Sequence, residues 1–91
     1  MYKSIQDIQK ANKEINNHWF DKSTMRFFNS RVGSKVYGGK YFISSEKSPY
    51  ITSRKYTIRI CVNGEIDTVG GFMAYRTRKA AEKAIKELLK G

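Results

Sequence analysis

The chain has 91 residues, enough for one domain with a single hydrophobic core and too few for two. Its 18 Lys and Arg outnumber its 8 Asp and Glu, which gives a formal net charge of +10, and its one cysteine excludes an intramolecular disulfide framework. No run approaches the about eighteen apolar residues of a membrane span or the apolar core of a secretory signal, so we expect one domain over residues 1–91 in a reducing cytoplasm, without a membrane partner.

The first predicted element is a helix over residues 5–15. Ser4 is suited to cap its N-terminus, and Asp7 follows three residues later as in a capping box. Apolar side chains recur at helical spacing, namely Ile5, Ile8, Ala11 and Ile15. Asn16 and Asn17 are plausible terminators, because Asn tolerates the left-handed conformation.

The next segment, residues 24–32, is rich in aromatic and apolar residues and is predicted to be a strand. The alternative for its beginning is a short capped turn at Asp21 or Ser23. Neither face of the predicted strand is purely apolar, so we expect one phenylalanine to enter the core and its neighbour to point away.

A glycine-containing loop over residues 33–39 leads to a second predicted strand, residues 40–46. A further loop contains Pro49, the only proline, and leads to residues 55–62. This third strand has the clearest alternation in the chain, with Tyr56, Ile58, Ile60 and Val62 on its core side.

Asn63 and Gly64 form the strongest hairpin signal, because a type I′ turn requires positive φ at both central positions. Residues 65–71 are the returning strand. A strict two-residue turn would place Ile66 on the cationic face of the sheet, whereas a bulge at Gly64 would return it to the core side. We predict the bulge.

The last predicted element is an amphipathic helix over residues 78–90 that begins at Thr77. Its apolar stripe consists of Ala81, Ala84, Ile85, Leu88 and Leu89. Before it, Phe72, Met73 and Tyr75 are predicted to pack on the sheet edge. The expected fold is α+β, with an N-terminal helix, a three- to four-stranded antiparallel sheet and a C-terminal helix. Both helices are expected on one sheet face, in two layers, leaving the other face in solvent.

The positive charge is concentrated in residues 22–64, which contain nine basic side chains and one acidic side chain, a net +8. Clustered cations attract nucleic acid by releasing its condensed counterions. The predicted phosphate contacts are Arg26, Arg31, Lys35, Lys40, Arg54, Lys55 and Arg59, with a second patch of Arg76, Arg78 and Lys79 at the start of the last helix. Exposed aromatics stack unpaired bases, and the candidates are Phe27 or Phe28, Tyr37 and Tyr41. Tyr37, in the glycine-containing loop, is the aromatic most expected to be exposed.

The residues offer little for catalysis. The only histidine, His18, lies at a helix end far in sequence from the only cysteine, Cys61, and no cluster has metal-ligand spacing. We therefore expect no catalytic residues, no metal, no cofactor and no enzymatic activity. The expected partner is DNA or RNA, and the chain is expected to be a monomer or a weak dimer. The alternative is an acidic protein partner.

The segment "KYTIRICVNGEIDTVGGF" followed by "TRKAAEKAIKELL" resembles the strand, hairpin and helix of two nucleic-acid-binding modules. One is the three-stranded DNA-binding domain of phage-type integrases, and the other is the double-stranded-RNA-binding domain. Both resemblances cover about a third of the chain, and both imply contact with nucleic acid.

A second resemblance covers most of the chain. The segments "HWFDKSTMRFFNSRV", "YFISSEKSPY", "RKYTIRI" and "IDTVGGF" resemble a family of small uncharacterised proteins from phages and mobile elements. This resemblance implies a bacterial host cell. It also implies an alternative function. In this alternative the protein inhibits a host defence system, as anti-CRISPR or anti-restriction proteins do, by binding an acidic host protein or nucleoprotein.

Overall fold

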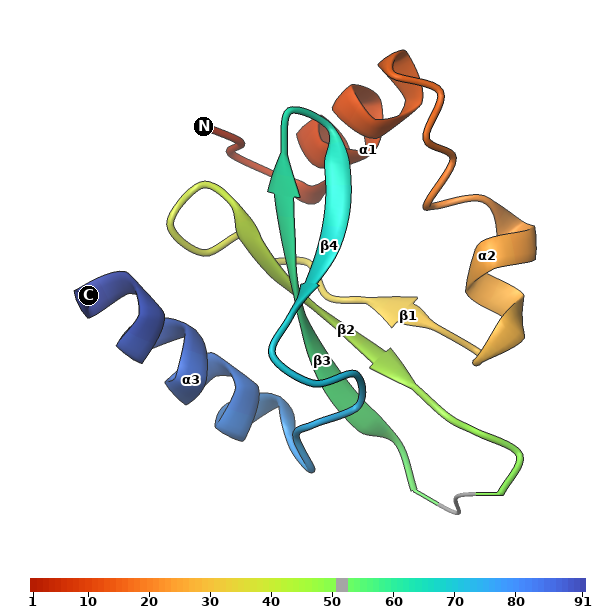
Figure 1. Cartoon of the computed structure of the whole chain (residues 1–91), viewed down its shortest axis with the longest axis vertical. Helices are drawn as coiled ribbons and strands as arrows, with labels where there is room; N and C mark the ends of the chain where they lie inside the picture. Colours follow the sequence, from red (N-terminus) through yellow and green to blue (C-terminus); the bar gives the residue numbers. More distant parts are fainter. Residues whose placement is uncertain (51–52) are drawn as a thin grey trace.

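A four-stranded antiparallel sheet forms the centre of the computed structural model, which describes residues 1–50 and 53–91. The strands lie in the order β1, β2, β3, β4, and three helices surround them (Figure 1). The elements in chain order are α1 (Ile5–Glu14), α2 (Lys22–Phe27), β1 (Arg31–Val32), β2 (Tyr41–Glu46), β3 (Lys55–Val62), β4 (Glu65–Val69) and α3 (Arg78–Lys90). The predicted α+β class and the order of helix, sheet and helix are confirmed. The predicted loop between β2 and β3 includes residues 51 and 52, which lie outside the described residues.

The two long helices cover opposite faces of the sheet (Figure 1). Neighbouring residues of a strand point to opposite faces, and on β2 Tyr41 joins the cluster with Ile85 of α3, whereas Phe42 joins the cluster with Ile5 and Ile8 of α1. The prediction of two layers with both helices on one face is therefore wrong. The second face also carries apolar residues that need cover, so no sheet face is left fully in solvent.

The predicted helix ends are confirmed. The Ser4 hydroxyl accepts a hydrogen bond from the Asp7 backbone N–H at 3.2 Å, and the Thr77 hydroxyl accepts one from Ala80 N–H at 3.1 Å. Asn16 follows α1 with a φ of 58°, the left-handed conformation expected of a terminator. None of the helices in the described part of the chain is long and apolar enough to cross a membrane.

The hairpin between β3 and β4 has a strict two-residue turn. Val62 pairs with Glu65 and Cys61 pairs with Ile66, while the two turn residues have φ values of 51° and 85°. The predicted bulge is wrong. Ile66 lies on the same face as Cys61, and because α1 covers that face, Ile66 still packs in a core.

The segment predicted as a strand over residues 24–32 begins instead as helix α2, and only Arg31 and Val32 form a strand, at the edge of the sheet. In a helix Met25 and Phe28 are three residues apart and lie on one side, whereas alternation along a strand would separate them. Both side chains are partly buried. Tertiary packing thus overrides the β-propensity of this aromatic segment.

Candidate nucleic-acid interface

Arg59, predicted to contact phosphates, is instead a buried residue of β3. Its side chain is 10% exposed and forms an ion pair at 3.3 Å with Glu46 of β2, which is completely buried. Its Nε donates a hydrogen bond to the Ser44 hydroxyl at 2.9 Å, and Nη1 donates to the Thr68 hydroxyl. Burial lowers the pKa of Arg59, and the neighbouring carboxylate opposes this shift. The prediction for Arg59 is wrong because alternation identifies a strand face but not what covers it.

The carboxylate of Glu46 extends this polar network to the loop between β4 and α3. Glu46 Oε1 accepts a hydrogen bond from the Thr57 hydroxyl at 2.6 Å, and the same hydroxyl oxygen accepts one from Met73 N–H at 2.9 Å. The Met73 backbone is therefore fixed on the sheet face. Its neighbour Phe72 is held above Arg59, with the guanidinium carbon 5.4 Å from the ring centroid.

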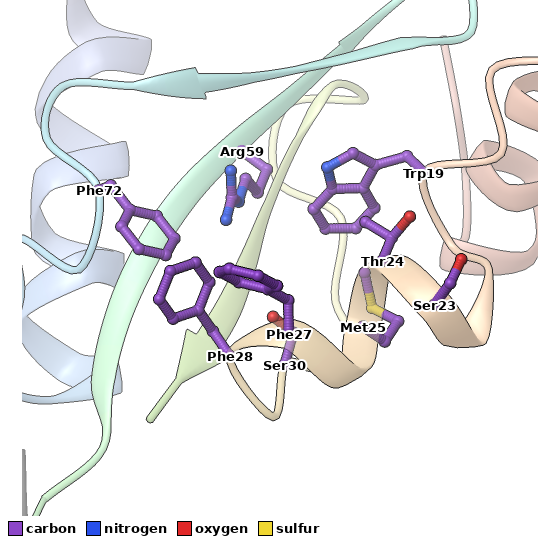
Figure 2. A pocket seen from close by; sticks show the side chains of 9 residues that line it. All are labelled: Trp19, Ser23, Thr24, Met25, Phe27, Phe28, Ser30, Arg59 and Phe72. Carbon is purple, nitrogen blue, oxygen red and sulfur yellow. The ribbon is translucent and has the colours of Figure 1, made fainter. Parts of the chain in front are cut away.

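Four aromatic side chains and Arg59 form a pocket of about 390 Å³ on the α2 side of the sheet (Figure 2). We call it the aromatic pocket; its nine lining residues are Trp19, Ser23, Thr24, Met25, Phe27, Phe28, Ser30, Arg59 and Phe72. Figure 2 shows the Arg59 guanidinium between Trp19 and Phe72. The Trp19 ring centroid lies 5.2 Å from the guanidinium carbon.

The rings of the aromatic pocket contact one another in a row. Phe27 and Phe28 have centroids 4.7 Å apart, and Phe28 and Phe72 have centroids 5.1 Å apart. Phe27 is nevertheless 77% exposed, which is unusual for so large an apolar side chain. Phe27 and Phe28 were candidate stacking residues in the sequence, but Trp19 and Phe72 were not. Trp19 and Phe72 are placed in the site by hydrogen bonds of their loops to distant residues, Trp19 N–H to Asn12 and the neighbouring Met73 N–H to Thr57. No local sequence motif predicts these contacts.

Arg54, beside the sheet edge, connects several segments. Its guanidinium donates to the Ser45 carbonyl at 3.0 Å, to the Ser45 hydroxyl at 2.9 Å and to the Asn29 carbonyl at 2.6 Å. Ser45 in turn pairs with Arg31 of β1. Burial and, next, the neighbouring charge of Arg31 lower the pKa of Arg54. Two predicted phosphate contacts are thus brought together.

The start of α3 adds further cations to the same region. Tyr56 and Tyr75 form an isolated antiparallel bridge, with a 2.7 Å hydrogen bond from Tyr56 N–H to the Tyr75 carbonyl. The guanidinium carbon of Arg78 lies 5.5 Å from the centroid of the Tyr56 ring. We define the basic end as Arg31, Arg54, Lys55, Arg76, Arg78 and Lys79. None of these six side chains forms an ion pair with a carboxylate of the described residues.

Half of the eight acidic residues lie away from the basic end. Asp7 and Glu14 belong to α1, Asp21 directly precedes α2, and Glu65 lies at the β3–β4 hairpin tip. A 2.8 Å hydrogen bond from Asn12 Nδ2 to the Gly64 carbonyl holds α1 to that tip. In Figure 1 α1 and the β3–β4 hairpin tip lie at the top, and the start of α3 and the start of β3 lie towards the bottom. Lys10 and Lys13 balance the two acids of α1, so the excess of positive charge lies at the basic end and not at the α1 end.

The other predicted contacts are not part of the basic end. Tyr37 is half-buried in the α3-side core, and its hydroxyl donates to Glu82 of α3; the prediction that it is the exposed stacking residue is wrong. Burial, together with this hydrogen bond, raises the pKa of Tyr37 to about 12. Lys35 lines a groove of about 440 Å³ together with Glu82 and with Arg78 of the basic end, so it lies next to the basic end, with the Glu82 carboxylate in the same groove. Lys40 precedes β2, and Arg26 is exposed on α2.

No group of three His, Cys, Asp or Glu residues able to hold a metal ion occurs in the described part of the chain. The fold and site define a small basic α+β domain in which an aromatic pocket lies beside unpaired arginines. Residues 4–86 match a family of unknown function (DUF7447), and the chain belongs to that family. No curated protein and no solved structure matches the chain significantly.

Proposed function

We propose that the protein binds nucleic acid through phosphate contacts at the basic end. The observation that carries this proposal is the set of six cationic side chains, none paired with a described carboxylate, at the end of the molecule opposite the acids of α1. Such a surface attracts a polyanion and releases its condensed counterions. Burial of Arg59 does not weaken this attraction. Arg59 and Glu46 are buried together with a combined charge of zero, so the net charge of the remaining residues equals that of the whole chain.

The N-terminus of α3 supports the same proposal. Its first residues, Arg78 and Lys79, follow Arg76, and its first turn contains no acidic residue. Backbone N–H groups and the positive end of the helix dipole add to the attraction for phosphate. The resemblance to small phage and mobile-element proteins supports a setting in the cytoplasm of a bacterial host cell.

The proposal is tested by fluorescence anisotropy with labelled duplex DNA and single-stranded DNA, and with the corresponding RNAs, over a series of salt concentrations. Four to six phosphate contacts on a duplex give a slope of log affinity against log salt of roughly −4 to −5. A slope near zero, or no saturable binding at low salt, would overturn the proposal. If a host protein were captured instead, the alternative function would take its place.

Matched variants locate the contact. The triple variant Arg76→Gln, Arg78→Gln, Lys79→Gln removes three charges from the basic end and is expected to lower the slope by about 2–3. Its control, Lys3→Gln, Lys10→Gln, Lys13→Gln, removes three exposed charges at or beside α1. Equal effects of the two triples would show attraction by net charge alone and would contradict an interface at the basic end.

A further inference from the structure

We infer that the aromatic pocket holds one unstacked nucleobase of a single strand whose phosphates lie on the basic end. This inference rests on the proposed function and adds the class of nucleic acid, because a paired and stacked base does not reach a pocket without extrusion from the helix. It adds to the phosphate contacts, which a duplex also offers, a preference for single strands or for unpaired bases within a structured strand.

The walls of the aromatic pocket suit a flat ring. The Phe27 ring is 77% exposed, and Trp19 lies across the pocket from the Phe28 and Phe72 side (Figure 2). Every base has a π-face that stacks on such rings regardless of sequence. The volume of about 390 Å³ fits the class of small-ligand pockets.

The floor of the pocket suits an occupant with hydrogen-bond acceptors. A guanidinium has five N–H donors, and the three side-chain bonds of Arg59, to Ser44, Glu46 and Thr68, use three of them. Base edges carry acceptors, and guanine offers two that match an arginine fork. A guanidinium donates hydrogen bonds and accepts none, so this floor offers nothing to the N–H donors of an ammonium group and differs in chemistry from aromatic cages that bind such groups.

The aromatic pocket is continuous with the basic end. The Asn29 carbonyl, one residue after Phe28, accepts the 2.6 Å hydrogen bond from Arg54, and the Phe28 carbonyl accepts a 2.7 Å bond from Lys47 N–H. No carboxylate belongs to the nine described lining residues, and Arg26 is exposed on the helix that forms one wall. The charge around the mouth therefore complements a phosphate backbone, not an acidic or neutral surface.

The test uses Trp19, the only tryptophan in the chain, as a reporter. Three oligonucleotides are titrated while tryptophan emission is recorded: a single strand, an abasic strand with the same number of phosphates, and a blunt duplex whose two shorter strands together carry that number. We expect the intact single strand to quench Trp19 and to bind about 10-fold or more tightly than the abasic strand, as one stacked base provides. The duplex and the abasic strand should leave the emission unchanged.

A pair of variants separates the pocket from other exposed rings. Phe27→Ala removes a ring that is largely in solvent, so the fold is retained, as circular dichroism would verify; we expect it to reduce the preference for the intact strand to about 2-fold or less. Tyr50→Ala removes a ring that is 94% exposed and outside the pocket lining, and should leave the preference unchanged.

The outcomes distinguish the two proposals. If the intact and abasic strands bind equally with a steep salt dependence, the phosphate interface stands and the base pocket is overturned. If neither strand binds, both proposals fail. If an acidic peptide with an aromatic side chain quenches Trp19 and the single strand does not, the pocket is overturned as a base site in favour of a protein partner.

Discussion

Arg59 and Glu46 form an ion pair at 3.3 Å between neighbouring strands, and both side chains are almost completely removed from solvent. Every charged atom of the pair in the described structure has a hydrogen-bond partner, supplied by hydroxyl groups and by the pair itself. Arg59 lies under Phe72 and beside Trp19 and forms the floor of the aromatic pocket, while Glu46 holds its guanidinium from the neighbouring strand. The stability of the fold and the shape of the site therefore depend on the same two residues.

We expect Glu46→Gln to lower the free energy of unfolding by about 3–5 kcal/mol, because it leaves the Arg59 charge buried without a counterion. Urea denaturation followed by circular dichroism measures the change. Glu87→Gln is the control: Glu87 and Lys90 are also 3.3 Å apart, but in solvent, and their loss should change the free energy by less than about 0.5 kcal/mol. Similar small changes for both variants would contradict a structural role for the buried pair.

The turn residue Gly64 has a φ of 85° and is packed against α1. A Cβ there would lie 2.7 Å from the Ala11 carbonyl oxygen. We expect Gly64→Ala to lower the free energy of unfolding by the penalty of the left-handed conformation, about 1–2 kcal/mol, plus about 1–3 kcal/mol for the displaced helix. The measurement is again urea denaturation.

The control for this prediction is Gly70→Ala. Gly70 has a similar φ of 76°, but its nearest neighbour to an added Cβ is the Tyr75 hydroxyl at 4.0 Å. Only the conformational penalty should appear there. Equal losses for the two variants would show that the contact between the hairpin tip and α1 contributes nothing to stability.

The sequence predicts the elements whose signals lie within a few adjacent residues. Ser4 and Thr77 cap helices, and Asn63 with Gly64 forms the hairpin turn, because each depends on its own backbone and on neighbours one to three residues away. The face on which α1 packs is different. It is determined by contacts between Ile8 and residues far along the chain. The local sequence around Asn63 and Gly64 is compatible with a strict turn and with a bulged turn, so it does not determine which face Ile66 occupies.

In the candidate interface, too, some residues can be predicted from the sequence and others depend on tertiary contacts. The cations of the basic end are identified by composition, since arginine and lysine remain at the surface unless a carboxylate is buried with them. Arg59 is the exception, and nothing in the alternation of β3 distinguishes it from Lys55. Its partner Glu46 and its cover Phe72 are separated from it by 13 residues each along the chain. Burial of a charged pair is a tertiary property, so local patterns do not predict it.

The hydrogen bond between Tyr37 and Glu82 predicts a pH-dependent stability. The folded-state pKa of Tyr37, about 12, is above the ordinary value of 10.0. The protonated hydroxyl therefore stabilises the fold at pH below 10, and this contribution is lost as the pH rises towards 12. We expect Tyr37→Phe to lower the free energy of unfolding by about 1 kcal/mol near neutral pH and by less at about pH 11.5.

Urea midpoints of the two proteins at about pH 8 and about pH 11.5 measure this effect. Tyr50→Phe, at a tyrosine that is 94% exposed, should leave the midpoint unchanged at both pH values. A constant difference between Tyr37→Phe and the unmodified protein across this pH range would show that the hydroxyl proton contributes nothing to the contact between the loop and α3.

Asn12 connects α1, the hairpin tip and the aromatic pocket, although it is an ordinary polar residue of a helix in the sequence. It is 1% exposed; its Nδ2 donates to the Gly64 carbonyl at 2.8 Å and to the Asn17 side chain at 2.9 Å, and its Oδ1 accepts from Trp19 N–H at 2.9 Å. Asn12→Ala leaves buried backbone groups without partners, and we expect a loss of about 2–4 kcal/mol in the free energy of unfolding. Because the backbone of Trp19 is released, its emission should also shift in the folded protein. Asn17→Ala is the control, because it removes one exposed partner of Asn12. It should change the free energy of unfolding by less than about 1 kcal/mol and leave the Trp19 emission unchanged. If the Trp19 emission were identical in the two variants, this wall of the pocket would be held by its aromatic contacts alone.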